Sequence, residues 1–199
     1  LLDYEKSSQW DYNLGACLEM DLEAFTVRML GKELNKLSPI FKAEVEAFED
    51  YLSAAATVYD YLIVGKDGYQ GSSSTMRWAL FNKDRYIMRR HSLEGMLFYL
   101  SDGIAPTDIA PSEFTIEMVS HEYDCFIKEL PYLDDDYSIE ERTAVLEVER
   151  AAWNNWVKVR SEIEKALSEN QRKIYHQQTG IICQSTYQML MDRNNKYIK

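Results

Sequence analysis

The chain has 199 residues, of which 33 are acidic and 22 basic, so its formal net charge is −11, and 46% of its residues are hydrophobic. This composition is that of a folded chain with a sizeable core, and 13% aromatic residues with only 8 glycines and 4 prolines exclude disordered or collagen-like classes. The acidic balance argues against nucleic acid and anionic membrane partners, and no apolar run is long enough for a transmembrane segment.

The first third of the chain shows helical spacing of its apolar residues. Leu18, Leu22, Phe25 and Met29 recur every three or four residues and predict a helix over residues 17–37. Ser38 and Pro39 then read as an N-cap and a first-turn proline, which starts a second helix. A continuous stripe predicts that this second helix buries one face: Phe41, Val45, Phe48, Leu52, Ala55, Tyr59 and Leu62.

A glycine- and serine-rich stretch over residues 65–74 is typical of a loop. A third helix is expected over about 74–100, with an interruption near His91 and Ser92. Residues 101–112 contain two prolines and no helical spacing, so they mark the clearest internal boundary.

Three more helices are predicted beyond this boundary. The fourth runs from Val119 to Leu130 and is ended by Pro131. Ser138 and Glu141 form a capping-box pattern that opens a long fifth helix. The inner face expected for that helix comprises Val145, Val148, Ala152, Trp156, Val159, Ile163 and Leu167. A sixth helix carries Ile182, Thr186, Met189 and Tyr197 towards the C-terminus.

Short matches in the same order suggest that the chain is duplicated. Residues 32–37 align with 128–133, the Ala47-Phe48-x-x-Tyr51 run aligns with Ala152-Trp153-x-x-Trp156, and residues 85–87 align with 196–198. The predicted fold is therefore all-α: two tandem three-helix units, residues 1–102 and 103–199, packed as a helical bundle.

The repeated unit resembles the lysozyme-inhibitor LprI-like family of secreted bacterial helical domains. The residues that carry the resemblance are Glu33-Leu34-Asn35, Gly68 and Gly71-Ser72 in the first unit, and Leu146, Glu149-Arg150, Ala152-Trp153, Trp156, Arg160 and Glu162 in the second. The resemblance implies a secreted, periplasmic or lipid-anchored domain whose signal peptide has been removed. Some members bind and inhibit lysozyme, and the family supplies no catalytic residues to carry over.

No pattern in the sequence indicates a metal, a cofactor or a catalytic site. The three cysteines, Cys17, Cys125 and Cys183, are too scattered for a metal or dithiol motif. Three buried thiols are favoured over a Cys125–Cys183 disulfide. Carboxylates two positions apart, such as Glu44 with Glu46 and Glu147 with Glu149, are read as solvated positions.

Two charged clusters carry competing interpretations. Arg89, Arg90 and His91 suit either a phosphate site or, preferably, cations opposing the dipole near a helix end. The acidic cluster, Asp134, Asp135, Asp136, Glu140 and Glu141, suits either stabilisation of a helix N-terminus or contact with a basic protein.

The aromatic pair Trp153 and Trp156 lies on one helix face with Arg160, and packing is the favoured role, with Arg160 paired or stacked on Trp156. The leading functional hypothesis is a non-enzymatic, extracytoplasmic protein that binds a cationic protein such as lysozyme. The alternative is a structural or assembly protein that uses helical surfaces, and an enzyme is the third hypothesis.

Overall fold

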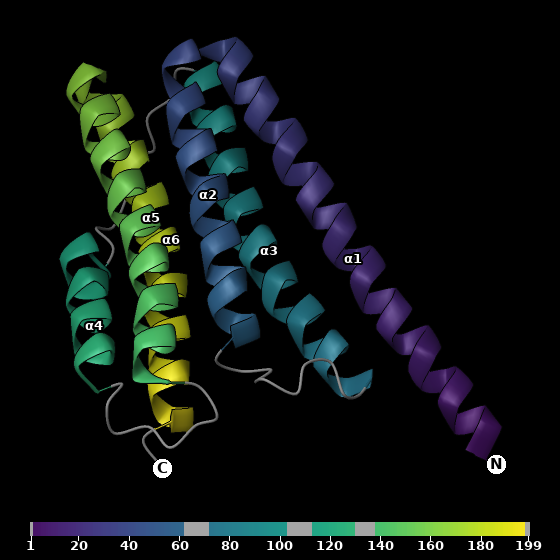
Figure 1. The fold of residues 1–199 in the computed structure, drawn as a ribbon. Coiled ribbons are helices and arrows are strands. Elements are labelled where there is room, and N and C mark those ends of the chain that lie inside the picture. Colours follow the sequence, from purple (N-terminus) through teal and green to yellow (C-terminus); the bar gives the residue numbers. More distant parts are fainter. Residues whose placement is uncertain (1, 62–71, 103–112, 130–137, 198–199) are drawn as a thin grey trace.

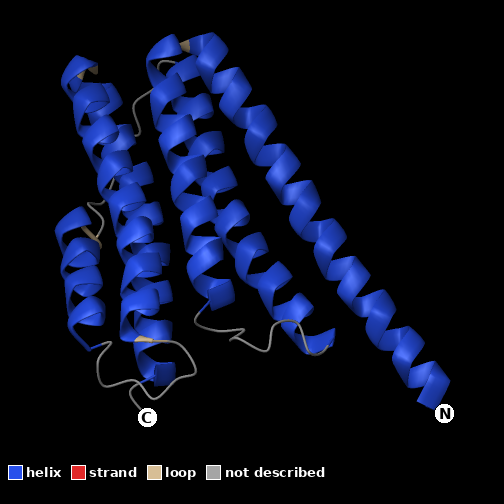
Figure 2. Cartoon of the chain, viewed as in Figure 1, coloured by secondary structure: helices blue, strands red, loops and turns tan. Residues whose placement is uncertain are grey.

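The computed structural model describes residues 2–61, 72–102, 113–129 and 138–197, and within these ranges every regular element is helical. The elements in chain order are α1 (Leu2–Leu37), the short 3-10 helix η1 (Pro39–Phe41), α2 (Lys42–Tyr59), α3 (Ser72–Asp102), α4 (Ile116–Glu129), α5 (Ile139–Ala166) and α6 (Glu169–Tyr197). The predicted all-α helical bundle is confirmed (Figures 1 and 2).

Four helices form the centre of the bundle. α2 packs against α5 and α3 packs against α6, while α1 lies along the outer side of α3 and α4 along α6 (Figure 1). We call α1–α3 the first half and α4–α6 the second half. Each half thus contributes two central helices and one peripheral helix. Among the described residues, no helix combines the length and apolarity needed to cross a bilayer.

The centre of the core is aromatic and is shared by both halves. Phe48 and Tyr51 of α2 meet Trp153 and Trp156 of α5, and all four side chains are fully buried. The Phe48 and Trp156 rings lie 5.4 Å apart, and the Tyr51 and Trp153 rings 5.3 Å apart, both edge to face. Such pairs add to the stability gained by burial alone, so the two halves are joined by one hydrophobic core.

The second helix follows its prediction closely. Ser38 has extended backbone angles and Pro39 follows at the first turn, although the Ser38 side chain makes no capping hydrogen bond and the first turn is 3-10. The predicted stripe is buried, comprising Phe41, Val45, Phe48, Leu52, Ala55 and Tyr59. Leu62, the last predicted member, lies outside the described residues.

Two helix predictions differ from the structure. α1 begins at Leu2, well before residue 17. The expected interruption of the third helix is wrong, because α3 continues through His91 and Ser92 without a break. Ser92 is buried beside Leu93, so the helix packs through this region.

The fifth helix starts as predicted, and its buried face matches the predicted one in part: Trp156, Ile163 and Leu167 are buried as expected. Glu141 donates its backbone N–H to Ser138 Oγ at 3.2 Å, and the Ser138 N–H donates to Glu141 Oε2 at 2.9 Å. Val148, however, is 62% exposed. The buried residues of α5 are Arg142, Leu146, Glu149, Trp153, Trp156, Arg160 and Ile163. Apolar spacing missed part of this face because three of its members are charged.

Candidate functional site

Two buried ion pairs lie on either side of the aromatic centre. Arg89 of α3 donates to Glu44 of α2 from Nη1 to Oε1 at 3.0 Å and from Nη2 to Oε2 at 2.7 Å. Arg193 of α6 donates in the same two-pronged way to Glu149 of α5, at 2.6 and 3.1 Å. The interpretation of Glu44 and Glu149 as solvated is therefore wrong, because both are fully buried and each satisfies a buried guanidinium.

Glu44 also links the two halves. Burial raises the pKa of Glu44, but the charge and hydrogen bonds of Arg89 outweigh this effect and hold the pKa below its ordinary value of 4.5. Trp156 Nε1 donates to Glu44 Oε1 at 2.9 Å. Since the carboxylate accepts three hydrogen bonds and remains ionised, it is a structural anchor and not a group poised to exchange protons.

A cavity of about 240 Å³ opens beside the second ion pair, between α2, α3 and α6. Its lining residues are Tyr59, Arg77, Phe81, Asp84, Arg85, Met189, Asp192 and Arg193. The Tyr59 and Phe81 rings stack 4.2 Å apart and form an apolar wall. The cavity combines cationic, apolar and acidic side chains, and we call it the α3–α6 pocket.

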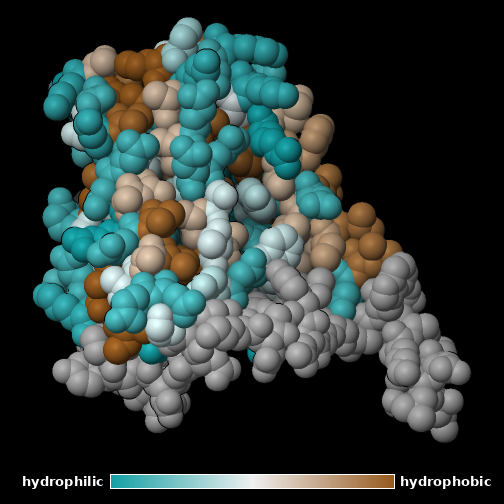
Figure 3. Space-filling view, in the orientation of Figure 1, coloured by the Kyte–Doolittle hydropathy of each residue, from teal (hydrophilic) through white to brown (hydrophobic). Residues whose placement is uncertain are grey.

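The outer face of α1 carries a row of exposed apolar side chains. Leu14, Leu18, Leu22, Phe25 and Met29 are between 41% and 64% exposed, and we call them the α1 stripe. These include the residues from which the helix was predicted, so this apolar face of α1 points away from the bundle. The space-filling view shows hydrophobic residues along the edge that α1 occupies (Figure 3).

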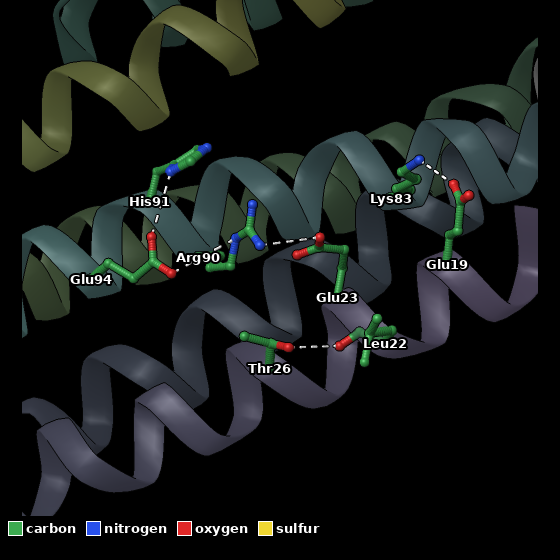
Figure 4. Close-up of polar contacts among 8 residues, drawn as sticks. All are labelled: Glu19, Leu22, Glu23, Thr26, Lys83, Arg90, His91 and Glu94. Atoms are coloured by element: carbon green, nitrogen blue, oxygen red, sulfur yellow. Dashed lines mark hydrogen bonds and ion pairs between the residues drawn. The ribbon is translucent and has the colours of Figure 1, made fainter.

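Ion pairs hold α1 with this face outward. Glu19 of α1 pairs with Lys83 of α3, and Glu23 pairs with Arg90 at 3.3 Å (Figure 4). The face that α1 turns towards the bundle is lined by Ala16, Met20 and Ala24, which are buried. The exposure of the α1 stripe is therefore set by contacts on the opposite side of the helix.

The basic cluster does not form a single site. Arg89 pairs with buried Glu44, Arg90 with Glu23 of α1, and His91 Nδ1 lies 3.6 Å from Glu94. α3 extends to Asp102, so these cations lie well inside the helix. Both the phosphate-site and the helix-end interpretations are wrong.

The acidic cluster is only partly described. Asp134, Asp135 and Asp136 lie outside the described residues. Glu140 is exposed in the first turn of α5, and Glu141 closes the capping box. Negative charge in this turn stabilises the helix N-terminus.

Four of the five predicted structural residues are buried in the core. Leu34 is buried with Val27 and Phe41, and Asn35 beside it is half-buried. Trp153 and Trp156 are buried, as expected for packing. Arg160 is also buried; its guanidinium carbon lies 5.4 Å from the centre of the Trp156 ring, and it donates a hydrogen bond to the Tyr175 carbonyl. Leu34, Trp153, Trp156 and Arg160 are thus part of the packed interior.

The chain matches no known protein family, no curated protein and no solved structure. The resemblance to the LprI-like family thus stays a prediction. Among the described residues, no group of three or more histidine, cysteine or acidic side chains is placed to hold a metal ion.

Proposed function

We propose that this protein is a non-enzymatic assembly protein that pairs through the α1 stripe with the same stripe of a second copy. The observation that carries the proposal is the exposure of the stripe, in which five large apolar side chains share one face of a helix whose opposite face is packed. Contiguous apolar surface is uncommon on proteins that work alone and marks interaction sites.

The spacing of the stripe suits a helical partner. From Leu18 to Met29 its members follow one another at intervals of four, three and four residues. This spacing keeps the side chains on one side of a helix. Such a row of side chains forms the seam along which two helices pack. At 1.5 Å per residue, the stripe from Leu14 to Met29 is about 22 Å long, roughly four turns.

Charge beside the stripe favours a second copy in antiparallel orientation. Asp21 and Arg28 are exposed on the same flank of the stripe, and neither forms an ion pair with a described residue. When two helices pack antiparallel, residues on the same flank face each other across the seam. Asp21 of each copy then faces Arg28 of the other, so the two-fold interface contains this pair twice.

Sedimentation analysis of the purified chain tests the proposal. The wild-type chain is expected to be a dimer, and Leu22→Glu is expected to be a monomer with an unchanged helical circular dichroism signal. Val148→Glu is the matched control, because Val148 of α5 is 62% exposed and Leu22 is 64% exposed. A wild-type chain that is monomeric at all concentrations, or a Leu22→Glu variant that stays dimeric, would overturn the proposal.

A charge exchange tests the orientation. Asp21→Arg and Arg28→Asp are each expected to weaken the dimer, since each places like charges across the seam. The double variant restores both pairs and is expected to recover dimer affinity. Two single variants that leave the affinity unchanged would contradict the antiparallel arrangement.

A second proposal follows from the resemblance: a secreted or periplasmic protein that binds a cationic protein such as lysozyme at residues 134–141. Its support is the net charge of −11 and the exposed Glu140 at the start of α5. Association between such oppositely charged proteins is expected to weaken as salt rises. A pull-down with lysozyme that fails at low salt would remove this proposal.

A further inference from the structure

The described part of the chain buries more positive than negative charge. Five arginines are buried, namely Arg85, Arg89, Arg142, Arg160 and Arg193, against the carboxylates of Glu44 and Glu149 alone. Arg89 and Arg193 take up both carboxylates. A buried charge without a counter-charge is costly, so the environment of each remaining arginine indicates whether a partner is missing.

Arg85 has no carboxylate partner among the described residues, and it lines the α3–α6 pocket. It is 8% exposed, and no described carboxylate lies within ion-pair distance of it. Its Nη1 donates to the Ser185 carbonyl at 3.1 Å, whereas its Nε is buried without a hydrogen-bond acceptor. Burial lowers the pKa of Arg85, but an arginine remains protonated, so the cavity retains an undercompensated cation.

The charges of the α3–α6 pocket change sign from its interior to its opening. Arg85 and Arg193 are buried, whereas Asp84 and Asp192 are exposed on the same two helices. Neither aspartate belongs to an ion pair among the described residues, although Gln188 donates to Asp192 at 3.0 Å. Arg77, also exposed, is the third charged residue at the opening, which leaves a net negative rim.

Apolar surface separates these two regions. The Tyr59–Phe81 stack and Met189 line the same cavity. A volume of about 240 Å³ suits a small molecule and excludes a folded partner. Phosphate and other polyanions are disfavoured, because Asp84 and Asp192 lie at the opening and Glu149 lies behind Arg193.

We propose that the α3–α6 pocket binds a small zwitterion, with its carboxylate on Arg85 and its ammonium group towards Asp84 and Asp192. The carboxylate supplies the counter-charge that the guanidinium lining the pocket lacks. The apolar segment of the ligand packs on Tyr59 and Phe81, and the acidic rim selects a cationic end over a neutral one.

Calorimetric titration with three probes of equal chain length tests each part of the ligand. We expect 6-aminohexanoate to bind most tightly, hexanoate, which lacks the ammonium group, to bind more weakly, and hexylamine, which lacks the carboxylate, to bind weakest. Arg85→Met is expected to weaken 6-aminohexanoate binding at least about tenfold, the effect of losing one charge-assisted hydrogen bond. Arg150→Met is the control, since Arg150 is half-exposed on α5 and pairs with Asp124 outside the pocket.

A second variant keeps the test decisive if Arg85→Met fails to fold. Asp84→Asn with Asp192→Asn changes exposed residues alone, and it is expected to abolish the preference for 6-aminohexanoate over hexanoate. The proposal would be overturned if the wild-type chain showed no saturable binding at millimolar probe concentration. It would also be overturned if both sets of substitutions left the affinity for the probes unchanged. The monomeric Leu22→Glu variant is expected to bind the probes normally, which separates the pocket from α1 pairing.

Discussion

The indole N–H of Trp156 in α5 donates to the Glu44 carboxylate of α2 at 2.9 Å, so the second half of the chain completes an ion pair that belongs to the first. The two hydrogen bonds from Arg89 leave further acceptor positions on a fully buried carboxylate to be satisfied. Trp156 fills one of them while its ring packs edge to face on Phe48, 5.4 Å away. One side chain therefore supplies both polar and apolar contact between the halves.

Replacing Trp156 by phenylalanine is expected to destabilise the fold by about 2 kcal/mol or more, because a hydrogen bond to a charged acceptor is lost together with ring contacts. Urea denaturation measures the free energy of unfolding. Trp78→Phe is a matched control, since the buried Trp78 indole nitrogen has no hydrogen-bond partner. Equal losses in the two variants would show that the Trp156–Glu44 hydrogen bond contributes nothing.

Glu44→Gln is expected to cost about 3 kcal/mol of unfolding free energy, because it removes one charge of a buried pair and leaves Arg89 uncompensated. Glu46→Gln on the same helix is the control: its side chain is 63% exposed and lies 3.8 Å from Lys42. An exposed pair of this kind contributes less than about 1 kcal/mol. Similar denaturation midpoints for the two variants would contradict the role assigned to Glu44.

The stabilising contribution of Glu44 is expected to depend on pH. Its pKa in the folded chain lies below the ordinary value of 4.5 that applies on unfolding, so folding favours the ionised form. The contribution is complete above about pH 4.5 and is lost as the pH falls through the folded-state pKa. The stability difference between wild type and Glu44→Gln, measured in urea at neutral pH and at about pH 3, should therefore shrink on acidification. A difference that grows would contradict this assignment.

The three thiols are free and are expected to differ in reactivity. Cys183 is buried, and burial raises its pKa to about 12, whereas Cys17 and Cys125 are partly exposed. A thiol reagent attacks the thiolate, so two cysteines should react in the native chain and the third after unfolding in guanidinium. Uniform labelling of all three in the native chain, located by mass spectrometry, would contradict the burial of Cys183.

The predictable part of the fold was the part that depends on local signals. The stripe of α2 and the Ser138 capping box follow from spacing and hydrogen-bonding chemistry within one helix. The α1 stripe could also be predicted from the sequence. The spacing of apolar residues identifies an apolar helix face, but it does not show whether another helix covers that face. Because small residues such as Ala16 and Ala24 fill the contact with α3, the face of α1 that carries the α1 stripe remains exposed to solvent.

The buried glutamates were missed because a charge on a helix is ordinarily solvated. A signal was nevertheless present: Glu44 lies three residues before Ala47, and Glu149 three residues before Ala152, at matching places in the proposed repeat. A carboxylate recurring there favours a shared structural role. The α3–α6 pocket gave no such signal, since its residues come from three helices whose packing no local pattern specifies.

The contacts at the centre of the bundle determine what each half of the chain loses when it is produced alone. Phe48 meets Trp156 while Tyr51 meets Trp153, and each half spans its own ion pair across almost the same separation, 45 residues in one and 44 in the other. A half produced alone would keep both partners of its ion pair but would expose its side of the two aromatic contacts. We therefore expect separately expressed halves to recover a folded state by complementation, because each half covers the aromatic side chains that the other exposes.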